Sequence, residues 1–371
     1  REEMKAGSLA RAAVAKGYER AFSAIFDSNL TTFLTALILY KIGTGSVKGF
    51  GLTLMIGIAT SLFCSLTVTR AIFDWRLAKN DANKLSIGKG FRAIDEANLS
   101  IIPRSKTFAI FSAILLVASL ATVVVRGFDF SIDFLGGQVY TVQYSETGAH
   151  EEDLSKVAAS AGLTNAKVRS YGDQAKNMYQ ISLKKTDDAT VKDRLQKALD
   201  DAGQKAQIIA SDEVGPTIGK ELRFNAILSI ILSWIAICLY IWFRFGKLGL
   251  GFGVGALVGL VHDTIISIGF ISLMGLSVDG ALIASVLTLI GYTINDKIVV
   301  FDRIRENSQI YGRSNFPKLV NSSINQCFSR TIITSLTTLF VCLILAVMGG
   351  SSIRDFGLVM VFGIIIGTYS S

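Results

Sequence analysis

A series of long apolar stretches constrains this chain more than any other feature of its sequence. Several windows approach or exceed the roughly 18 to 20 apolar residues that cross the hydrocarbon core of a bilayer as a helix. Half of the 371 residues are hydrophobic, 18% are charged and three are proline, which favours long helices with short connections. We therefore predict a polytopic α-helical membrane protein. Eight membrane segments are expected, near residues 28–45, 50–70, 107–125, 224–243, 249–274, 281–301, 331–348 and 356–371.

The basic residues predict the orientation of these segments. The connections at 1–27, 71–106, 244–247 and 303–330 are rich in Lys and Arg, which marks them as cytoplasmic. A polar insert, residues 126–222, then falls on the outer face, where it carries 12 Lys/Arg against 15 Asp/Glu. The basic pI of about 9.2 therefore reflects orientation and contact with anionic lipid, and we expect no nucleic-acid partner.

Within the insert the hydrophobic period changes from that of membrane helices to that of a small α+β domain. Strands are predicted at 139–144, 167–171, 178–183 and 206–210, and helices at 150–161 and 190–202. This β-α-β-β-α-β order predicts a ferredoxin-like, split βαβ module on the extracytoplasmic side.

The chain also contains an internal repeat. Residues 22–65 align without a gap on residues 328–371, with about a third of the positions identical, and each copy follows an Arg-Glu motif. An even number of predicted crossings separates the copies. They should therefore share one orientation, as parallel repeats related by an axis along the membrane normal.

An acid inside one apolar segment is the strongest candidate for a functional group. In GYTINDKIVVFDRIRE, residues 291–306, Asp296 lies within a predicted membrane helix, where an ionised carboxylate costs on the order of 2.5 to 3.5 kcal/mol. Helical spacing places Tyr292 and Asn295 on its face, which we expect to point into the bundle. Because burial disfavours the charged form, such a group can gain and lose protons. The structural alternative is a fixed pair with Lys297 or an arginine.

Lys297 itself is turned about 100° from Asp296 on the helix, and it has two interpretations: it snorkels toward the cytoplasmic headgroups, or it stays close and forms a pair. A second acid, Asp263 in LVHDTIISIGF, falls near the middle of segment 249–274. It is interpreted either as a proton relay or polar gating contact, or as an interhelical hydrogen-bond site together with His262.

Arg330 has two interpretations at the start of segment 331–348. An arginine at a cytoplasmic helix end is ordinarily an anchor, but its guanidinium could reach Asp296 and form an ion pair that protonation breaks. In the first repeat, Asp27 and Asn29 stand where the second has apolar or hydroxyl groups. The two repeats are thus expected to do different work.

GLGFGVGALVG, residues 249–259, has the small-xxx-small spacing of a close-packing helix face at Gly251, Gly255 and Gly259. It lacks the preceding strand and the Gly-Lys-Ser/Thr ending of a nucleotide loop. The four cysteines and two histidines form no metal-ligand pattern, and no catalytic set is apparent. We expect no enzyme activity, no cofactor and no metal.

Several motifs together resemble the SecD/SecF family. SIDFLGGQ, EVGPTIGKEL, YIWFRFG, GYTINDKIVVFDRIRE and SRTIITSLTT resemble SecF, whereas REEMKAG, AFSAIFDSNLTT and GTGSVKGFGLTLMIGIATS resemble the end of SecD. The resemblance implies the following division: 1–75 as the end of a SecD-like half, 76–106 as a basic cytoplasmic linker, 107–125 as the first SecF-like helix, 126–222 as the extracytoplasmic domain, and 223–371 as the remaining SecF-like helices.

The resemblance further implies a helix bundle of the resistance-nodulation-division (RND) superfamily that uses the proton gradient to assist preprotein export across the bacterial inner membrane. Its implied partners are the SecYEG channel, the SecA motor and YajC. Asp296 matches the intramembrane acid of the family and Arg330 its partner arginine, and the matching SecD acid is expected upstream of Arg1. Lys297 departs from the small or hydroxylated residue usual there, which counts against a simple proton carrier. The alternatives are a proton-coupled exporter of small molecules or lipids, and a purely structural partner of the channel.

Overall fold

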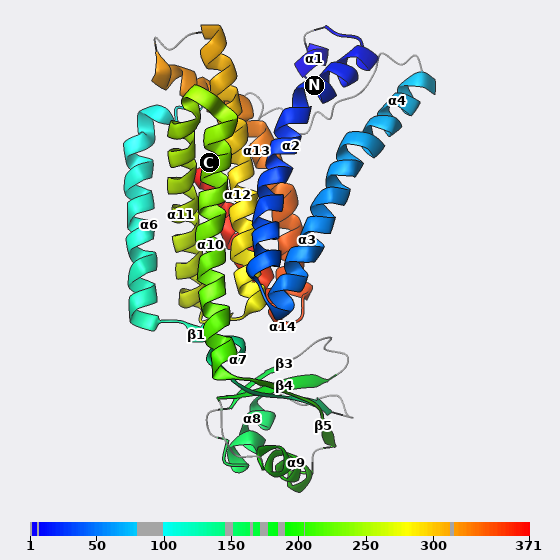
Figure 1. Ribbon diagram of the computed structural model, residues 1–371, viewed down its shortest axis with the longest axis vertical. Helices are drawn as coiled ribbons and strands as arrows, with labels where there is room; N and C mark the ends of the chain where they lie inside the picture. Colours follow the sequence, from blue (N-terminus) through cyan, green and yellow to red (C-terminus); the bar gives the residue numbers. More distant parts are fainter. Residues whose placement is uncertain are drawn as a thin grey trace.

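The computed structural model describes residues 2–5, 7–79, 99–144, 151–163, 166–170, 177–184, 190–203, 205–311 and 315–371. Most of the predicted linker 76–106 and the predicted helix start at His150 lie outside these residues. The described chain forms a bundle of long helices with a small α+β module at one end (Figure 1).

Long helices occur at all eight predicted membrane segments. Within the described residues, seven helical apolar stretches are long enough to cross a membrane, and the longest, Thr217–Met274, contains two of the helices. The helices are α2 (Ala10–Ile42), α3 (Gly45–Phe63), which continues through a π-helical segment into α4 (Thr69–Lys79), α6 (Ser105–Arg126), α10 (Pro216–Phe245), α11 (Gly249–Met274), α12 (Gly280–Tyr311), α13 (Phe316–Met348) and α14 (Ser351–Ser370). The predicted polytopic helical class is confirmed.

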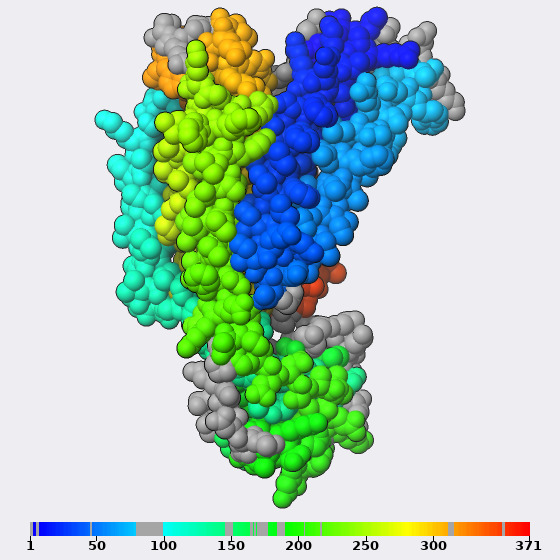
Figure 2. All heavy atoms as spheres, viewed as in Figure 1, coloured from blue at the N-terminus to red at the C-terminus, as the bar shows by residue number. Residues whose placement is uncertain are grey.

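The ends of the bundle agree with the charge pattern of the sequence. In Figure 1, α1 (Glu2–Lys5), the end of α4, the end of α12 and the start of α13 lie at the end opposite to the α+β module. Figure 2 shows the module extending beyond the ends of the apolar helices, with α10 leading into it. The described helix ends that border the basic connections and the α+β module therefore lie at opposite ends of the bundle.

Burial separates a central helix from peripheral ones. The most apolar window of α12 is 78% buried, whereas that of α6 is 0% buried. Helix α12 contacts α2, α3, α10, α11, α13 and α14. Its buried residues Leu282, Ile290 and Ile294 belong to the main hydrophobic cluster of the bundle. A polar group on α12 is therefore placed between helices, while apolar groups on α6 are free to face lipid.

The two repeats fold alike. Helices α2 and α13 have the same length of 33 residues and begin at equivalent positions of the alignment. In each copy a glycine of the following helix lies against the backbone of the first. A Cβ on Gly51 would lie 2.7 Å from the Tyr40 nitrogen, and one on Gly357 would lie 2.6 Å from the Ala346 nitrogen. Since these positions are equivalent, the close α2–α3 and α13–α14 hairpins come from the same small residue.

Helix α11 ends because of a local backbone signal. Gly275 adopts the left-handed conformation, with φ of 62°, and the N–H of Leu276 donates to the Ile271 carbonyl at 3.1 Å. This capping pattern suits glycine, which has no Cβ to clash. Beyond it, β6 (Ser277–Val278) pairs in parallel with β1 (Asp129–Phe130), which follows α6.

The insert forms one mixed module. After α7 (Ile132–Leu135) the elements follow as β2 (Gly137–Tyr144), α8 (Glu151–Ser160), β3 (Lys167–Ser170), β4 (Met178–Lys184), α9 (Val191–Asp201) and β5 (Ala206–Val214). The sheet order is β3-β4-β2-β5 with every neighbouring pair antiparallel, and β5 is longer than expected. The ferredoxin-like classification stays a prediction from this element order.

Periodicity explains the core of the module. Val191, Leu195 and Leu199 recur every four residues on α9 and are fully buried, as an amphipathic helix requires. They pack with the buried Tyr140, Val142 and Tyr144 of β2, which alternate along the strand.

Candidate functional site in the membrane helices

Two turns of α12 carry four of the candidate site residues from the sequence. Tyr292, Asn295, Asp296 and Lys297 all lie in this central helix, but their side chains meet different neighbours. The face predicted from helical spacing is therefore divided among α2, α13 and a layer formed by α11 and α14.

Asp296 points between helices, as predicted, and is only 8% exposed. Its carboxyl group is within hydrogen-bonding reach of Thr334 on α13 and interacts electrostatically with Lys297 and Arg330. Among the described residues no cation lies within salt-bridge distance of it. Asp296 is thus a buried carboxyl group with a polar neighbour and two more distant positive charges.

Arg330 does not form the direct ion pair that was one interpretation of the sequence. Its side chain is exposed, and it acts on Asp296 only as a nearby charge. Tyr292 lies beside Asp296, half-buried, and faces Ser335 and Thr338 of α13. The α12–α13 contact therefore carries Asp296, Tyr292 and Arg330 together.

Asn295 faces a different helix. Thr31 of α2 donates to its Oδ1 at 3.5 Å. Thr32 donates at 2.9 Å to the carbonyl of Gly291, which lies one turn before Asn295 on α12. A Cβ on Gly291 would lie 2.8 Å from the Thr35 hydroxyl oxygen, so only glycine permits this approach of α2. Asn295 and Gly291 belong to the α2 contact and not to the surroundings of Asp296.

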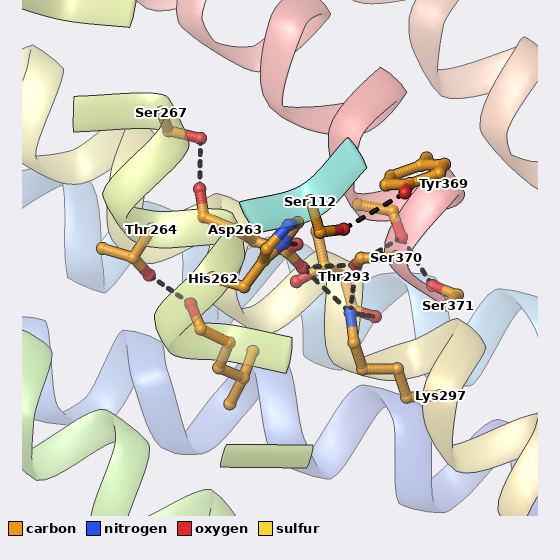
Figure 3. A network of polar contacts seen from close by, with 12 residues as sticks. Ser112, His262, Asp263, Thr264, Ser267, Thr293, Lys297, Tyr369, Ser370 and Ser371 are labelled. Atoms are coloured by element: carbon orange, nitrogen blue, oxygen red, sulfur yellow. Dashed lines mark hydrogen bonds and ion pairs between the residues drawn. The ribbon is translucent and has the colours of Figure 1, made fainter. Parts of the chain in front are cut away.

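Of the two interpretations of Lys297, snorkelling is wrong: the side chain forms a pair, and its partner is Asp263 rather than Asp296. Its side chain is 5% exposed, and its ammonium group donates at 2.9 Å to Asp263 Oδ2 on α11 and at 2.9 Å to Ser370 Oγ on α14 (Figure 3). Because α11 lies across from that face of α12, the aliphatic stem runs into the bundle and does not reach the headgroups. A buried cation is tolerated here because it meets an acid and a hydroxyl group.

Asp263 is therefore an interhelical group, but its main partner is Lys297. Its other oxygen, Oδ1, lies 2.9 Å from Nδ1 of the adjacent His262, so the predicted His262 contact stays within α11. Ser370 Oγ also donates to Asp263 Oδ2 at 2.9 Å. We call His262, Asp263, Lys297 and Ser370 the paired cluster (Figure 3). The proton-relay and gating roles of Asp263 stay predictions.

A glycine makes room for this cluster. A Cβ on Gly259 would lie 2.6 Å from Cε of Lys297, whereas one on Gly251 would meet nothing within 4 Å and one on Gly255 only a ring atom at 4.0 Å. The predicted close-packing face of three glycines is thus correct only at Gly259. Its close neighbour is a buried lysine side chain rather than a helix backbone.

Asp27 in the first repeat forms a second charged contact. It is 6% exposed and accepts from Tyr240 Oη at 2.7 Å and from Arg244 Nε at 2.9 Å, both on α10. Arg244 also bonds to Ser23, one turn before Asp27. In the described part of the chain, Asn29 donates to the carbonyl of Ile25 in its own helix and has no further hydrogen bond from its side chain.

Tyr240 and Arg244 are missing from the sequence-based candidates. Arg244 lies within YIWFRFG and is counted in the sequence among the basic residues that set orientation. A tyrosine and an arginine four residues apart on one helix share a face, which is the signal that could have paired them with an acid.

Comparison with known proteins places this geometry in a family. Family models match the chain in three parts: protein export membrane protein SecD/SecF, C-terminal, over residues 194–371, the SecD/SecF GG motif over 122–147, and the MMPL family over 1–75. The protein translocase subunit SecF of Calditerrivibrio nitroreducens is 36% identical over 287 residues, covering 75% of this chain and 91% of that protein. The chain belongs to the SecD/SecF family.

Longer relatives of the SecD/SecF family contain both halves. The protein translocase subunit SecDF of Thermus thermophilus is 38% identical over 375 residues, which are 100% of this chain and 49% of that protein. The crystal structure of SecDF, a translocon-associated membrane protein from Thermus thermophilus, matches with a TM-score of 0.84 and 35% identity, again over 100% and 49%. This chain therefore spans about half the length of its SecDF relatives.

A more distant structure shares the fold alone. The cryo-EM structure of the hedgehog release protein Disp from the water bear Hypsibius dujardini matches with a TM-score of 0.59 at 11% identity, over 95% of this chain and 57% of that chain. With the SecDF match, it agrees with the predicted RND-like bundle. The chain is a multi-pass membrane protein of this superfamily.

Proposed function

We propose that this chain is part of an accessory subunit of the Sec translocation machinery that uses the proton motive force to assist preprotein export. It would lie in the bacterial cytoplasmic membrane, with residues 126–222 on the outer side. Its relatives are called protein translocase subunits, which supports association with Sec components. The SecYEG channel, SecA and YajC are the proposed partners.

One observation carries the energetic part of the proposal. Asp296 is a buried carboxyl group on the central helix, and no cation of the described residues pairs with it directly. Burial favours its neutral form, while Thr334, Lys297 and Arg330 favour its charged form. These opposing influences allow proton binding and release to change the α12–α13 contact.

The change would reach the outer module through α10. This helix follows β5 directly, and near its start a Cβ on Gly219 would lie 2.7 Å from the Phe134 carbonyl oxygen of α7. At its other end Arg244 binds Asp27 of α2, which also packs on α12. A rearrangement around α12 is thus transmitted by packed helices to the base of the module.

The decisive experiment replaces Asp296 by Asn in the full-length protein. Export of a preprotein into inverted membrane vesicles is measured with ATP alone and with an added proton gradient. We expect the ATP-driven part to remain and the gradient-stimulated part to be lost. Asp302→Asn is the matched control, because Asp302 lies on the same helix but is 35% exposed and pairs with Arg305. Gradient stimulation that survives Asp296→Asn would leave only the structural role.

A further inference from the structure

The paired cluster contains a group for which neither Asp296 nor the proposed function accounts. His262 is a buried histidine near the middle of α11, with a side chain that is 10% exposed. We propose that its Nε2 atom is a second proton-binding position in the membrane domain, separate from Asp296. The existence of this position is independent of the proposed function, and only its use in transport rests on it.

The first step concerns the charge of Asp263. Its Oδ2 accepts from the Lys297 ammonium group and from Ser370, each at 2.9 Å, and its side chain is 3% exposed. An ammonium ion at hydrogen-bond distance compensates the negative charge, so Asp263 remains a carboxylate. Asp263 is thus the anion of the cluster and does not itself carry the proton.

The second step fixes the histidine tautomer. A carboxylate can only accept hydrogen bonds, so Nδ1 of His262, 2.9 Å from Asp263 Oδ1, must be the donor. Once Nδ1 carries a hydrogen, Nε2 has a free lone pair in the neutral ring. The same arrangement of a carboxylate behind an imidazole holds the ring and stabilises its protonated form in catalytic triads.

The third step is that Nε2 has no hydrogen-bond partner within the described part of the chain, although it is buried. A buried acceptor without a partner costs about 1 to 3 kcal/mol. The hydroxyl oxygen of Thr293, whose carbonyl faces the Lys297 ammonium group at 3.5 Å, is also buried without a partner. Nε2 of His262 therefore keeps an unpaired lone pair in a buried position.

Few charged groups surround this position. From α12, Lys297 shares the carboxylate of Asp263 with His262. Helix α14 contributes Tyr369, which bonds with Ser112 of α6 at 3.1 Å, while α10 places Cys238 against Gly253 further along α11. The Lys297–Asp263 ion pair is therefore the charged group that contacts His262.

The test uses the small number of histidines. The chain has only His150 and His262, so ¹⁵N-histidine labelling of the full-length protein in lipid, with other histidines replaced by Gln, leaves one ring to observe. We expect the Nδ1–H tautomer in the neutral ring and a second proton on Nε2 after acidification. An Nε2–H tautomer, or a ring that stays neutral in acid, would overturn the proposal.

A variant pair then tests whether transport uses the position. His262→Asn retains an N–H group near Nδ1 but cannot take a proton, and His262→Gln places its amide near Nε2 instead. If transport uses the proton, both variants remain folded but lose the pH dependence of gradient-stimulated export. The two proposals are distinguished by comparison with Asp296→Asn. If that variant loses gradient stimulation while the His262 ring in the wild type takes up no proton, the proposed function is retained and this inference is rejected.

Discussion

Asp263 and Asp296 are both acids buried within apolar helices, yet their carboxyl groups contact different kinds of side chain. Asp263 accepts from Lys297, His262 and Ser370 and ties α11 to α12 and α14. Asp296 lies beside Thr334 and has two positive charges at longer range. An acid whose charge is matched at contact distance stabilises one packing, whereas an acid without such a match can change its charge. The contrast concerns what each carboxyl group touches rather than how deeply it is buried.

Removing Lys297 should produce the largest effect. Lys297→Met leaves Asp263 as a buried charge without its cation, which costs about 3 to 5 kcal/mol of unfolding free energy. Adding Asp263→Asn to the same chain should recover most of that loss. Thermal unfolding in detergent measures both, with Lys318→Met, an exposed lysine at the start of α13, as the control. If Lys297→Met alone unfolds like the wild type, the paired cluster does not stabilise the packing of α11, α12 and α14.

Gly259→Ala should come next. The added methyl group overlaps Cε of Lys297, so the lysine stem must move or the helices must separate, at a cost of about 1 to 3 kcal/mol. The cost should vanish in a Lys297→Ser background, where the stem is absent. Gly251→Ala, whose Cβ meets nothing within 4 Å, should be neutral or stabilising. Equal losses at Gly259 with and without Lys297 would show that another contact is responsible.

Tyr240→Phe tests whether the contacts of Asp27, like those of Asp263, stabilise the packing of helices. The substitution removes the hydroxyl donor at 2.7 Å but leaves Arg244 in place. We expect a loss of about 1.5 kcal/mol, the lower end for a hydrogen bond to a charged group, because Arg244 still compensates the Asp27 charge. Unfolding of Phe243→Leu, a side chain 90% exposed on the same helix, provides the baseline. If the two variants unfold at the same temperature, the Tyr240–Asp27 contact does not stabilise the helix packing.

Asp296→Asn should change stability least, by about 0.5 kcal/mol or less. No ion pair at contact distance is lost, and an amide is easier to bury than a charge. The same substitution at Asp263 should be clearly destabilising, because Lys297 then loses its anion. Parallel melting curves of the two variants compare the acids directly. Similar losses at both sites would mean that Asp296 is held as tightly as Asp263.

The two repeats show how far local sequence information reaches. Their gapless alignment predicted a repeat in one orientation, and α2 and α13 indeed have equal lengths and equivalent glycine contacts. The strands and helices of the insert were also marked by local periodicity. Such signals concern neighbours along the chain, so no packing information is needed to read them.

The candidate site could be predicted only in part. Intramembrane position singled out Asp296, Asp263 and Lys297, but the partners of Lys297 were wrong and Arg244 was missed. Helical spacing states that two side chains diverge by about 100°, not which helix each one meets. Arg330 illustrates the same limit, since its reach toward Asp296 depends on the distance between α12 and α13.

By itself the sequence determined that this chain crosses a membrane repeatedly, carries an α+β insert at one end and belongs among SecD/SecF proteins, because apolar length, periodicity and motifs are properties of contiguous residues. Only the tertiary structure decided that Lys297 neutralises Asp263 while Asp296 has no contact cation. That choice depends on which helices surround α12 and on the space left by Gly259, and such contacts between distant segments arise only when the helices pack.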